Sequence, residues 1–144
     1  MKCLFATLTA SAFALLAAQA SADPLPMDTP VSVDGIQTVC TGVGSDKDDP
    51  RWQSYPVRVE FSNGAAQFLA GAQVTLSTHG HQIAAFECAG PWVLLQLPPG
   101  SYRVTAELTG EPNSVARSTN FVTPGRFSGQ QRVEIQFPHM GANQ

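Results

Sequence analysis

Alternation of apolar and polar residues with a period of two dominates the chain after residue 56. Val57, Val59 and Phe61 alternate with Arg58 and Glu60. The same pattern recurs in residues 72–76, 102–108 and 133–137. Successive side chains of a β-strand point to opposite faces, so this pattern predicts strands with one buried and one solvated face. From residue 23 onward no segment shows a sustained apolar period of 3.6, and the chain is predicted to be all-β.

Turn signals separate these strands at regular intervals. Turns rich in glycine, proline or serine occupy residues 62–64, 77–80, 89–91 and 98–100. Residues 92–97 are apolar on both faces, which is typical of a central strand covered on both sides. Seven to eight short strands at spacings of about ten residues predict a single antiparallel β-sandwich.

The first 22 residues have the pattern of a secretory signal peptide. Lys2 supplies a positive charge, an uncharged apolar run extends to about Ala18, and Ala20-Ser21-Ala22 offers small residues for cleavage. A membrane anchor is the alternative, but the run is shorter than the roughly 20 apolar residues that span a bilayer. We expect cleavage after Ala22 and a periplasmic or secreted protein without a membrane span.

The exported part is expected to be one domain with a leader and a tail. Residues 23–35 hold three prolines and three aspartates and are predicted to be a flexible leader. The sandwich is expected in residues 36–138 and a tail in residues 139–144. Loss of Lys2 leaves seven basic and eleven acidic residues, a net charge of −4, and no basic patch for nucleic acid.

Signal cleavage would also remove Cys3 and leave Cys40 and Cys88. An even pair of cysteines in an oxidising compartment predicts a disulfide. Closing a loop of this length would stabilise the fold by up to about 4 kcal/mol. Two buried thiols on separate strands are the alternative.

Residues 97–104, Leu-Pro-Pro-Gly-Ser-Tyr-Arg-Val, resemble the corner of the carboxypeptidase regulatory-like, transthyretin-like (prealbumin-like) family. Strand 72–76 and the turn at Gly80 also fit, and the resemblance covers about residues 56–108. It implies a prealbumin- or immunoglobulin-like sandwich in which Tyr102 enters a new strand facing the core. The family is a structural module found beside peptidases, in receptors and in secreted proteins, so it implies no activity.

The chain also resembles short bacterial periplasmic proteins with a Gly-x-Gly loop before the sandwich and a Gly-Pro-Trp strand. Residues 42–44 and 90–92 carry these motifs here. Trp92 could join Trp52 and Tyr55 in an aromatic platform, but on a central strand it is instead expected to plug the core of the sandwich.

Two imidazoles flank one glycine in His79-Gly80-His81, and imidazole suits Cu(II) or Zn(II). A metal site needs three or four ligands, and the third would come from His139 or Glu87. A hairpin turn with two solvated histidines is the alternative, and we expect no resident cofactor.

Trp52 and Tyr55 lie in a segment without alternation, so they are candidate exposed aromatics that could stack on sugar or peptide. No Gly-x-Ser-x-Gly elbow for a nucleophilic serine occurs in the sequence. We therefore expect a non-enzymatic sandwich that contacts a protein or an envelope component. The alternatives are a carbohydrate or small-ligand binding module using Trp52 and Tyr55, and a copper or zinc protein using His79 and His81.

Overall fold

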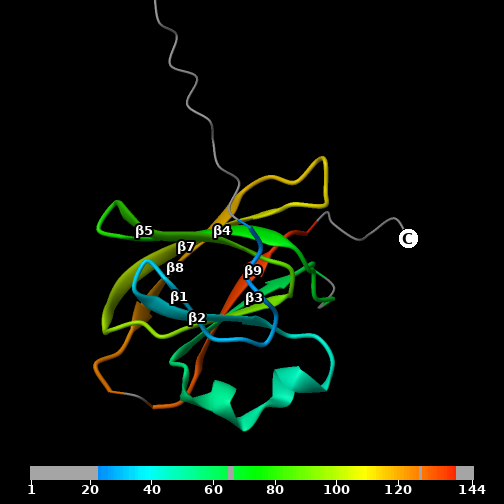
Figure 1. The fold of residues 1–144 in the computed structure, drawn as a ribbon. Coiled ribbons are helices and arrows are strands. Elements are labelled where there is room, and N and C mark those ends of the chain that lie inside the picture. The colour runs from blue at the N-terminus through cyan, green and yellow to red at the C-terminus, as the bar shows by residue number, and fades with distance from the viewer. Residues whose placement is uncertain (1–22, 65–66, 127, 139–144) are drawn as a thin grey trace, which may run out of the picture.

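Two β-sheets pack face to face in a computed structural model that describes residues 23–64, 67–126 and 128–138 (Figure 1). The elements in chain order are β1 (Val31–Val33), β2 (Ile36–Thr41), the 3₁₀ helices η1 (Ser45–Asp48) and η2 (Pro50–Ser54), β3 (Val57–Ser62), β4 (Ala72–Thr78), β5 (His81–Cys88), β6 (Trp92–Leu95), β7 (Gly100–Leu108), β8 (Arg117–Thr123) and β9 (Gln131–Gln136).

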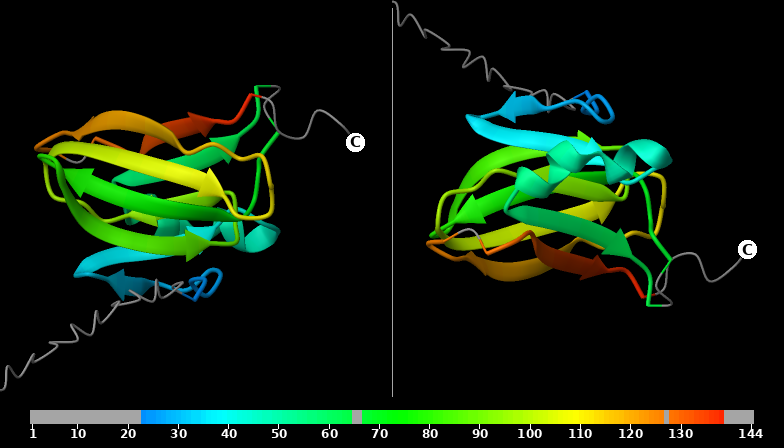
Figure 2. Two further views of the ribbon diagram at one scale, coloured as in Figure 1. Left: turned by 90° about the horizontal axis from the view of Figure 1, so that it is seen from above. Right: turned by 90° about the horizontal axis from the view of Figure 1, so that it is seen from below.

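The larger sheet has the strand order β1-β2-β6-β3-β9 and the smaller sheet has the order β5-β4-β7-β8. Figure 2 shows the two layers from opposite sides. Neighbouring strands are antiparallel except β3 and β9, which run parallel. The predicted all-β sandwich is confirmed, with nine strands and no α-helix among the described residues.

The ninth strand, β1, lies in the segment expected to be a leader and forms a hairpin with β2. Asp34 and Gly35 have φ angles of 49° and 84°, and Val33 pairs with Ile36. Positive φ at both central residues is the mark of a two-residue turn whose twist matches that of the flanking strands. The turn therefore ends the expected leader, residues 23–35, and places β1 within it.

The core lies between the two sheets and follows the predicted alternation. Val57, Val59 and Phe61 of β3 are fully buried. β6 is the central strand of the larger sheet, as its apolar composition predicts. The Tyr102 hydroxyl, 2.6 Å from the Pro98 carbonyl oxygen, donates a hydrogen bond that fixes the β6–β7 corner. Burial raises the pKa of this hydroxyl.

A disulfide joins the two sheets and confirms the predicted pairing. Cys40 belongs to β2 of the larger sheet, and Cys88 ends β5 of the smaller sheet. Their Cα atoms lie 5.6 Å apart, and both residues are fully buried. The bond therefore crosses the core rather than linking surface loops.

The expectation of a flexible leader over residues 23–35 is wrong, because this segment is part of the sandwich. The Leu25 amide donates to the Glu87 carbonyl at 2.9 Å, and the Asp28 amide donates to the Cys40 carbonyl at 2.8 Å. Leu25 and Met27 are two residues apart, so both pack against the core. The prolines at positions 24 and 26 have no amide hydrogen, but these two hydrogen bonds use the amides of Leu25 and Asp28 instead.

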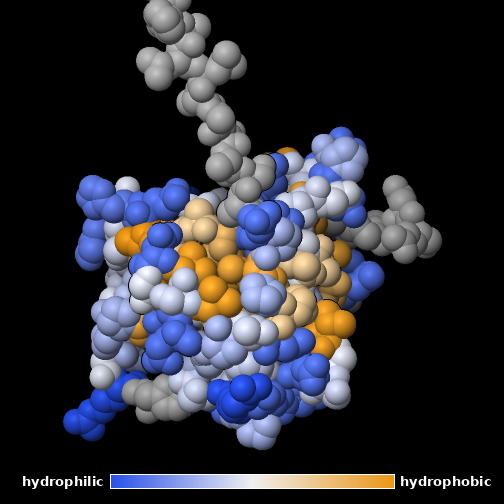
Figure 3. All heavy atoms as spheres, viewed as in Figure 1, coloured by the Kyte–Doolittle hydropathy of each residue, from blue (hydrophilic) through white to orange (hydrophobic). Residues whose placement is uncertain are grey.

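The leader covers the side of the sandwich where β1 lies near β5. The Met27 sulfur is 3.5 Å from the Cys40 sulfur, and Thr41 donates to the Asp28 carboxylate at 2.6 Å. Figure 3 shows apolar residues gathered on this face, over β1 and β2.

The predicted signal peptide, 1–22, and tail, 139–144, lie outside the described residues. Within the described residues no helix is long and apolar enough to cross a bilayer.

Candidate interaction surface around Trp92

Trp92 lies on the outer face of the larger sheet and not in the core. Val93 and Leu95 face the core, and strand alternation turns Trp92 to the opposite side. The expectation that Trp92 plugs the sandwich is therefore wrong. The register of β6 places Trp92 between Thr41 of β2 and Glu60 of β3.

Helices η1 and η2 cover the neighbouring part of this outer face, as the right-hand view in Figure 2, taken from below, shows. Trp52 and Tyr55 are only 3% and 7% exposed, and they form a second small core with Val39 and Leu94. A 3₁₀ helix has three residues per turn, so positions 52 and 55 point to the same side, toward the sheet. The prediction that Trp52 and Tyr55 are exposed ligand contacts is wrong.

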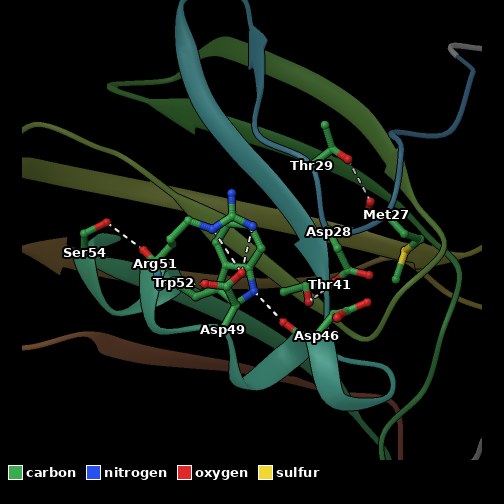
Figure 4. A network of polar contacts seen from close by, with 9 residues as sticks. All are labelled: Met27, Asp28, Thr29, Thr41, Asp46, Asp49, Arg51, Trp52 and Ser54. Atoms are coloured by element: carbon green, nitrogen blue, oxygen red, sulfur yellow. Dashed lines mark hydrogen bonds and ion pairs between the residues drawn. The ribbon is translucent and has the colours of Figure 1, made fainter.

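Most polar contacts of this covering segment are made between its own residues (Figure 4). The Trp52 indole nitrogen donates to the Asp46 carbonyl at 2.7 Å. The Arg51 guanidinium lies 4.9 Å from the Trp52 ring centroid and donates to the Asp49 carboxylate at 2.7 Å. Hydrogen bonds from Arg51 lower the pKa of Asp49. The segment has a structural role, because its aromatic rings and most of its polar groups are used internally.

Trp92 carries two side chains against its ring. The Arg58 guanidinium lies 4.5 Å from the ring centroid, a cation–π geometry. Phe68 meets the ring edge-on, with centroids 5.6 Å apart and planes at 84°. The Trp92 indole nitrogen is buried and has no hydrogen-bond acceptor among the described residues. Such a group is costly to bury, so Trp92 is not explained by fold stability alone.

The two glycine motifs of the sequence meet at this tryptophan. A Cβ on Gly42 would lie 2.8 Å from the Pro91 ring and 2.8 Å from Trp92 Cγ. A Cβ on Gly90 would lie 2.4 Å from the Thr41 carbonyl oxygen. A side chain at either position would clash with these neighbours, so both positions require glycine. The close packing at both glycines holds the backbone beside Trp92 in place.

Glu60 is a buried carboxylate at the centre of the same face. It is 1% exposed and forms ion pairs with Arg58, at 2.9 Å, and with Arg132. The Arg58 Nε–H is close to the carboxylate but is not aligned for a hydrogen bond, so this contact is an ion pair only. Glu60 thus holds two guanidinium groups in fixed positions beside Trp92.

The charges next to Glu60 respond to these contacts. The hydrogen bond to Glu60 raises the pKa of Arg132 further above its ordinary value. Glu134 lies two residues after Arg132 on β9. The Ser62 hydroxyl, at the end of β3, donates a hydrogen bond to Glu134 at 2.6 Å and lowers the pKa of that carboxyl. Arg132 therefore stays charged at every physiological pH.

Two exposed apolar residues belong to segments that contact the tryptophan. Phe68 is 44% exposed, and Val43, the residue after Gly42, is 55% exposed. Together with Arg58, Trp92 and Arg132 they make up what we call the Trp92 surface. Apolar and aromatic groups beside arginine are enriched in the centres of protein interfaces.

The candidate metal ligands lie elsewhere, in the β4–β5 turn. His79 and Gly80 have φ angles of 49° and 77°, and Thr78 pairs with His81, so these residues form a tight hairpin turn. Both histidines are exposed. The described residues hold no cluster of three or more ligating side chains, and His139 lies outside them.

Sequence reasoning missed Glu60, Arg132 and Phe68 as parts of the site. The alternation of β3 correctly turns Glu60 away from the core, but it carries no information on what covers the outer face. Phe68 lies in a segment without alternation, and it reaches the site through a bridge to Ser62. The Gly-Pro-Trp motif is the one sequence feature that points to the site, because it begins β6, the strand that carries Trp92.

Comparison of the sequence with protein-family models and with curated proteins gave no match.

Proposed function

We propose that the chain is an exported, non-enzymatic β-sandwich of the carboxypeptidase regulatory-like kind. It acts as an interaction module for a protein or another component of the cell envelope. The Trp92 surface is the contact site. The proposed location rests on the signal-peptide pattern of residues 1–22, and the N-terminal mass of the exported protein tests it, with a start at Asp23 expected and a start at Met1 contrary.

The observation that carries this proposal is the preorganised set of side chains around Trp92. Buried Glu60 anchors Arg58, and Arg58 in turn stacks on the Trp92 ring. Phe68 and Val43 are left exposed beside them. A partner that docks there would gain apolar burial without paying for the ordering of long side chains.

Affinity capture from cell-envelope extract tests the proposal with two exposed positions as a matched pair. Phe68→Ser removes the exposed aromatic of the Trp92 surface. Val115→Ser changes an apolar residue of 68% exposure outside that surface. We expect a polypeptide that copurifies with the wild type and with Val115→Ser to be lost with Phe68→Ser. Equal capture by both variants, or no capture under several conditions, would contradict the proposal.

The carbohydrate alternative loses its original basis because Trp52 and Tyr55 are buried. Within the part of the chain that the structure describes, the copper or zinc alternative retains only His79 and His81 as ligands. Calorimetry with Cu²⁺ and Zn²⁺ on the wild type and on a His79→Ala/His81→Ala variant distinguishes a metal site from a solvated turn.

A further inference from the structure

We propose that a groove on the smaller sheet, around Arg103, binds a sugar acid of the hexuronate class. The groove lies beside the β4–β5 turn and extends across β7 to β8, with a volume of about 490 Å³. This is within the range of small-ligand sites, about 300–1,000 Å³. The groove is on the other sheet from the Trp92 surface, so this inference is independent of the proposed function.

The sheet register gathers three polar residues into one row. Ser77 of β4 lies opposite Arg103 of β7, and Arg103 lies opposite Asn120 of β8. Directly opposed side chains in antiparallel strands are about 5 Å apart. The row therefore presents a hydroxyl, a guanidinium and an amide along one line, at intervals that several polar groups of one sugar ring can span.

The charge of the groove points to an anion. Arg103 is exposed, and its guanidinium makes no hydrogen bond or ion pair with the residues that the structure describes. No aspartate or glutamate lines the groove, although the whole chain has a net charge of −3. A free guanidinium offers paired N–H groups that match a carboxylate.

The remaining lining favours a sugar over other anions. A cavity of this volume is much larger than an inorganic anion needs. Ser101 and Asn120 supply polar groups for ring hydroxyls, and Val122, 62% exposed, supplies an apolar contact for ring carbons. A peptide would bind most readily along a free strand edge. This groove instead opens on the outer face of the smaller sheet, over β4, β7 and β8, rather than along the free edge of β8.

Calorimetric titration of the purified full chain with digalacturonate tests the inference. The fully methyl-esterified disaccharide is the neutral counterpart, and inorganic sulfate and an acidic tripeptide, Asp-Asp-Asp, are the competing anions. Arg103→Gln removes the charge within the groove. Arg117→Gln, an exposed arginine of β8 outside the lining, is the matched control. Both positions are exposed, so both variants should fold.

We expect digalacturonate to bind the wild type and Arg117→Gln equally. Binding should weaken about tenfold or more for Arg103→Gln, and about as much when the ester replaces the acid, because a charge-assisted contact is lost. Unchanged affinity in Arg103→Gln, equal affinity for acid and ester, or no binding at millimolar concentration would overturn the inference. Sulfate or the tripeptide binding as tightly as digalacturonate would also overturn it. Phe68→Ser should leave this titration unchanged, which separates it from the Trp92 surface.

Discussion

Glu60 shows how a polar position of a strand can become one of the most buried residues of the molecule. Alternation in β3 turns it away from the core, as the sequence predicts. It is nevertheless 1% exposed because Trp92, from β6, and Arg132, from β9, surround it. Arg132 is 72 positions away in sequence, and a local pattern contains no information about such a partner.

Replacing Glu60 with Gln should lower the free energy of unfolding by about 1–3 kcal/mol. The substitution keeps the shape but leaves two guanidinium groups without their anion. The side chains of Arg58 and Arg132 are 27% and 56% exposed, so water recovers part of the loss and the cost stays below that of a fully buried pair. Urea unfolding measures the change. Exposed Glu107→Gln serves as control with an expected change below about 0.5 kcal/mol, and equal effects of the two would contradict the role of Glu60.

The Ser62–Glu134 pair should make stability depend on pH in acid. A carboxyl with a lowered folded pKa contributes stability that is present above its unfolded pKa, near 4.5, and is lost as pH falls through the folded pKa. Ser62→Ala removes the largest cause of the lowering. The stability difference between wild type and variant should therefore be largest at neutral pH and shrink below about pH 4.5. A stability difference between wild type and Ser62→Ala that stays constant from neutral pH to below pH 4.5 would contradict the role of this hydrogen bond.

Elements that lack a two-residue period are those whose positions the sequence did not predict. Residues 23–30 bind both sheets through isolated backbone bridges, and η1 and η2 cover the larger sheet with residues three apart. Neither arrangement produces, in the sequence, the alternation of a strand or the long apolar stripe of an α-helix. The strands with clear alternation, such as β3 and β7, were predicted correctly for the same reason: their pattern spans enough residues to define a face.

The turn between β5 and β6 offers a test of packing at the scale of an element. Gly90→Ala would place a methyl group 2.4 Å from the Thr41 carbonyl oxygen, which belongs to the β2 backbone and cannot move freely. The expected loss is about 2 kcal/mol or more in thermal or urea unfolding. Gly110→Ala is the matched control, since nothing lies within 4 Å of its Cβ position and its φ is not positive. A similar small change for both variants would show that the close approach is relaxed in solution.

For the whole molecule, the sandwich and its disulfide followed from the sequence, whereas the outer faces did not. Alternation identifies a buried face in each strand, and an even cysteine pair suggests a link. Which outward residues remain accessible depends on tertiary covering, as the opposite outcomes at Trp52 and Trp92 illustrate. Trp52 is buried against Val39 and Leu94 of the larger sheet, whereas Trp92 is partly exposed on its outer face.

Removing the disulfide should cost the whole fold a large part of its stability. Cys40 and Cys88 are separated by 48 positions, which corresponds to about 4 kcal/mol in the chain-entropy model. A Cys40→Ala/Cys88→Ala variant should show that loss in urea unfolding, and wild type in excess reductant should match it. A loss below about 1 kcal/mol would mean that the two sheets are held together by packing alone.

The central claim, that the Trp92 surface is the contact site, is tested most directly by photo-crosslinking in cells that express the protein. A photoreactive phenylalanine derivative is placed at Val43 within the surface and at Val115 outside it, since these residues are 55% and 68% exposed. We predict a discrete adduct from position 43 and none from position 115. The absence of an adduct at position 43, or the same adducts from both positions, would contradict the claim.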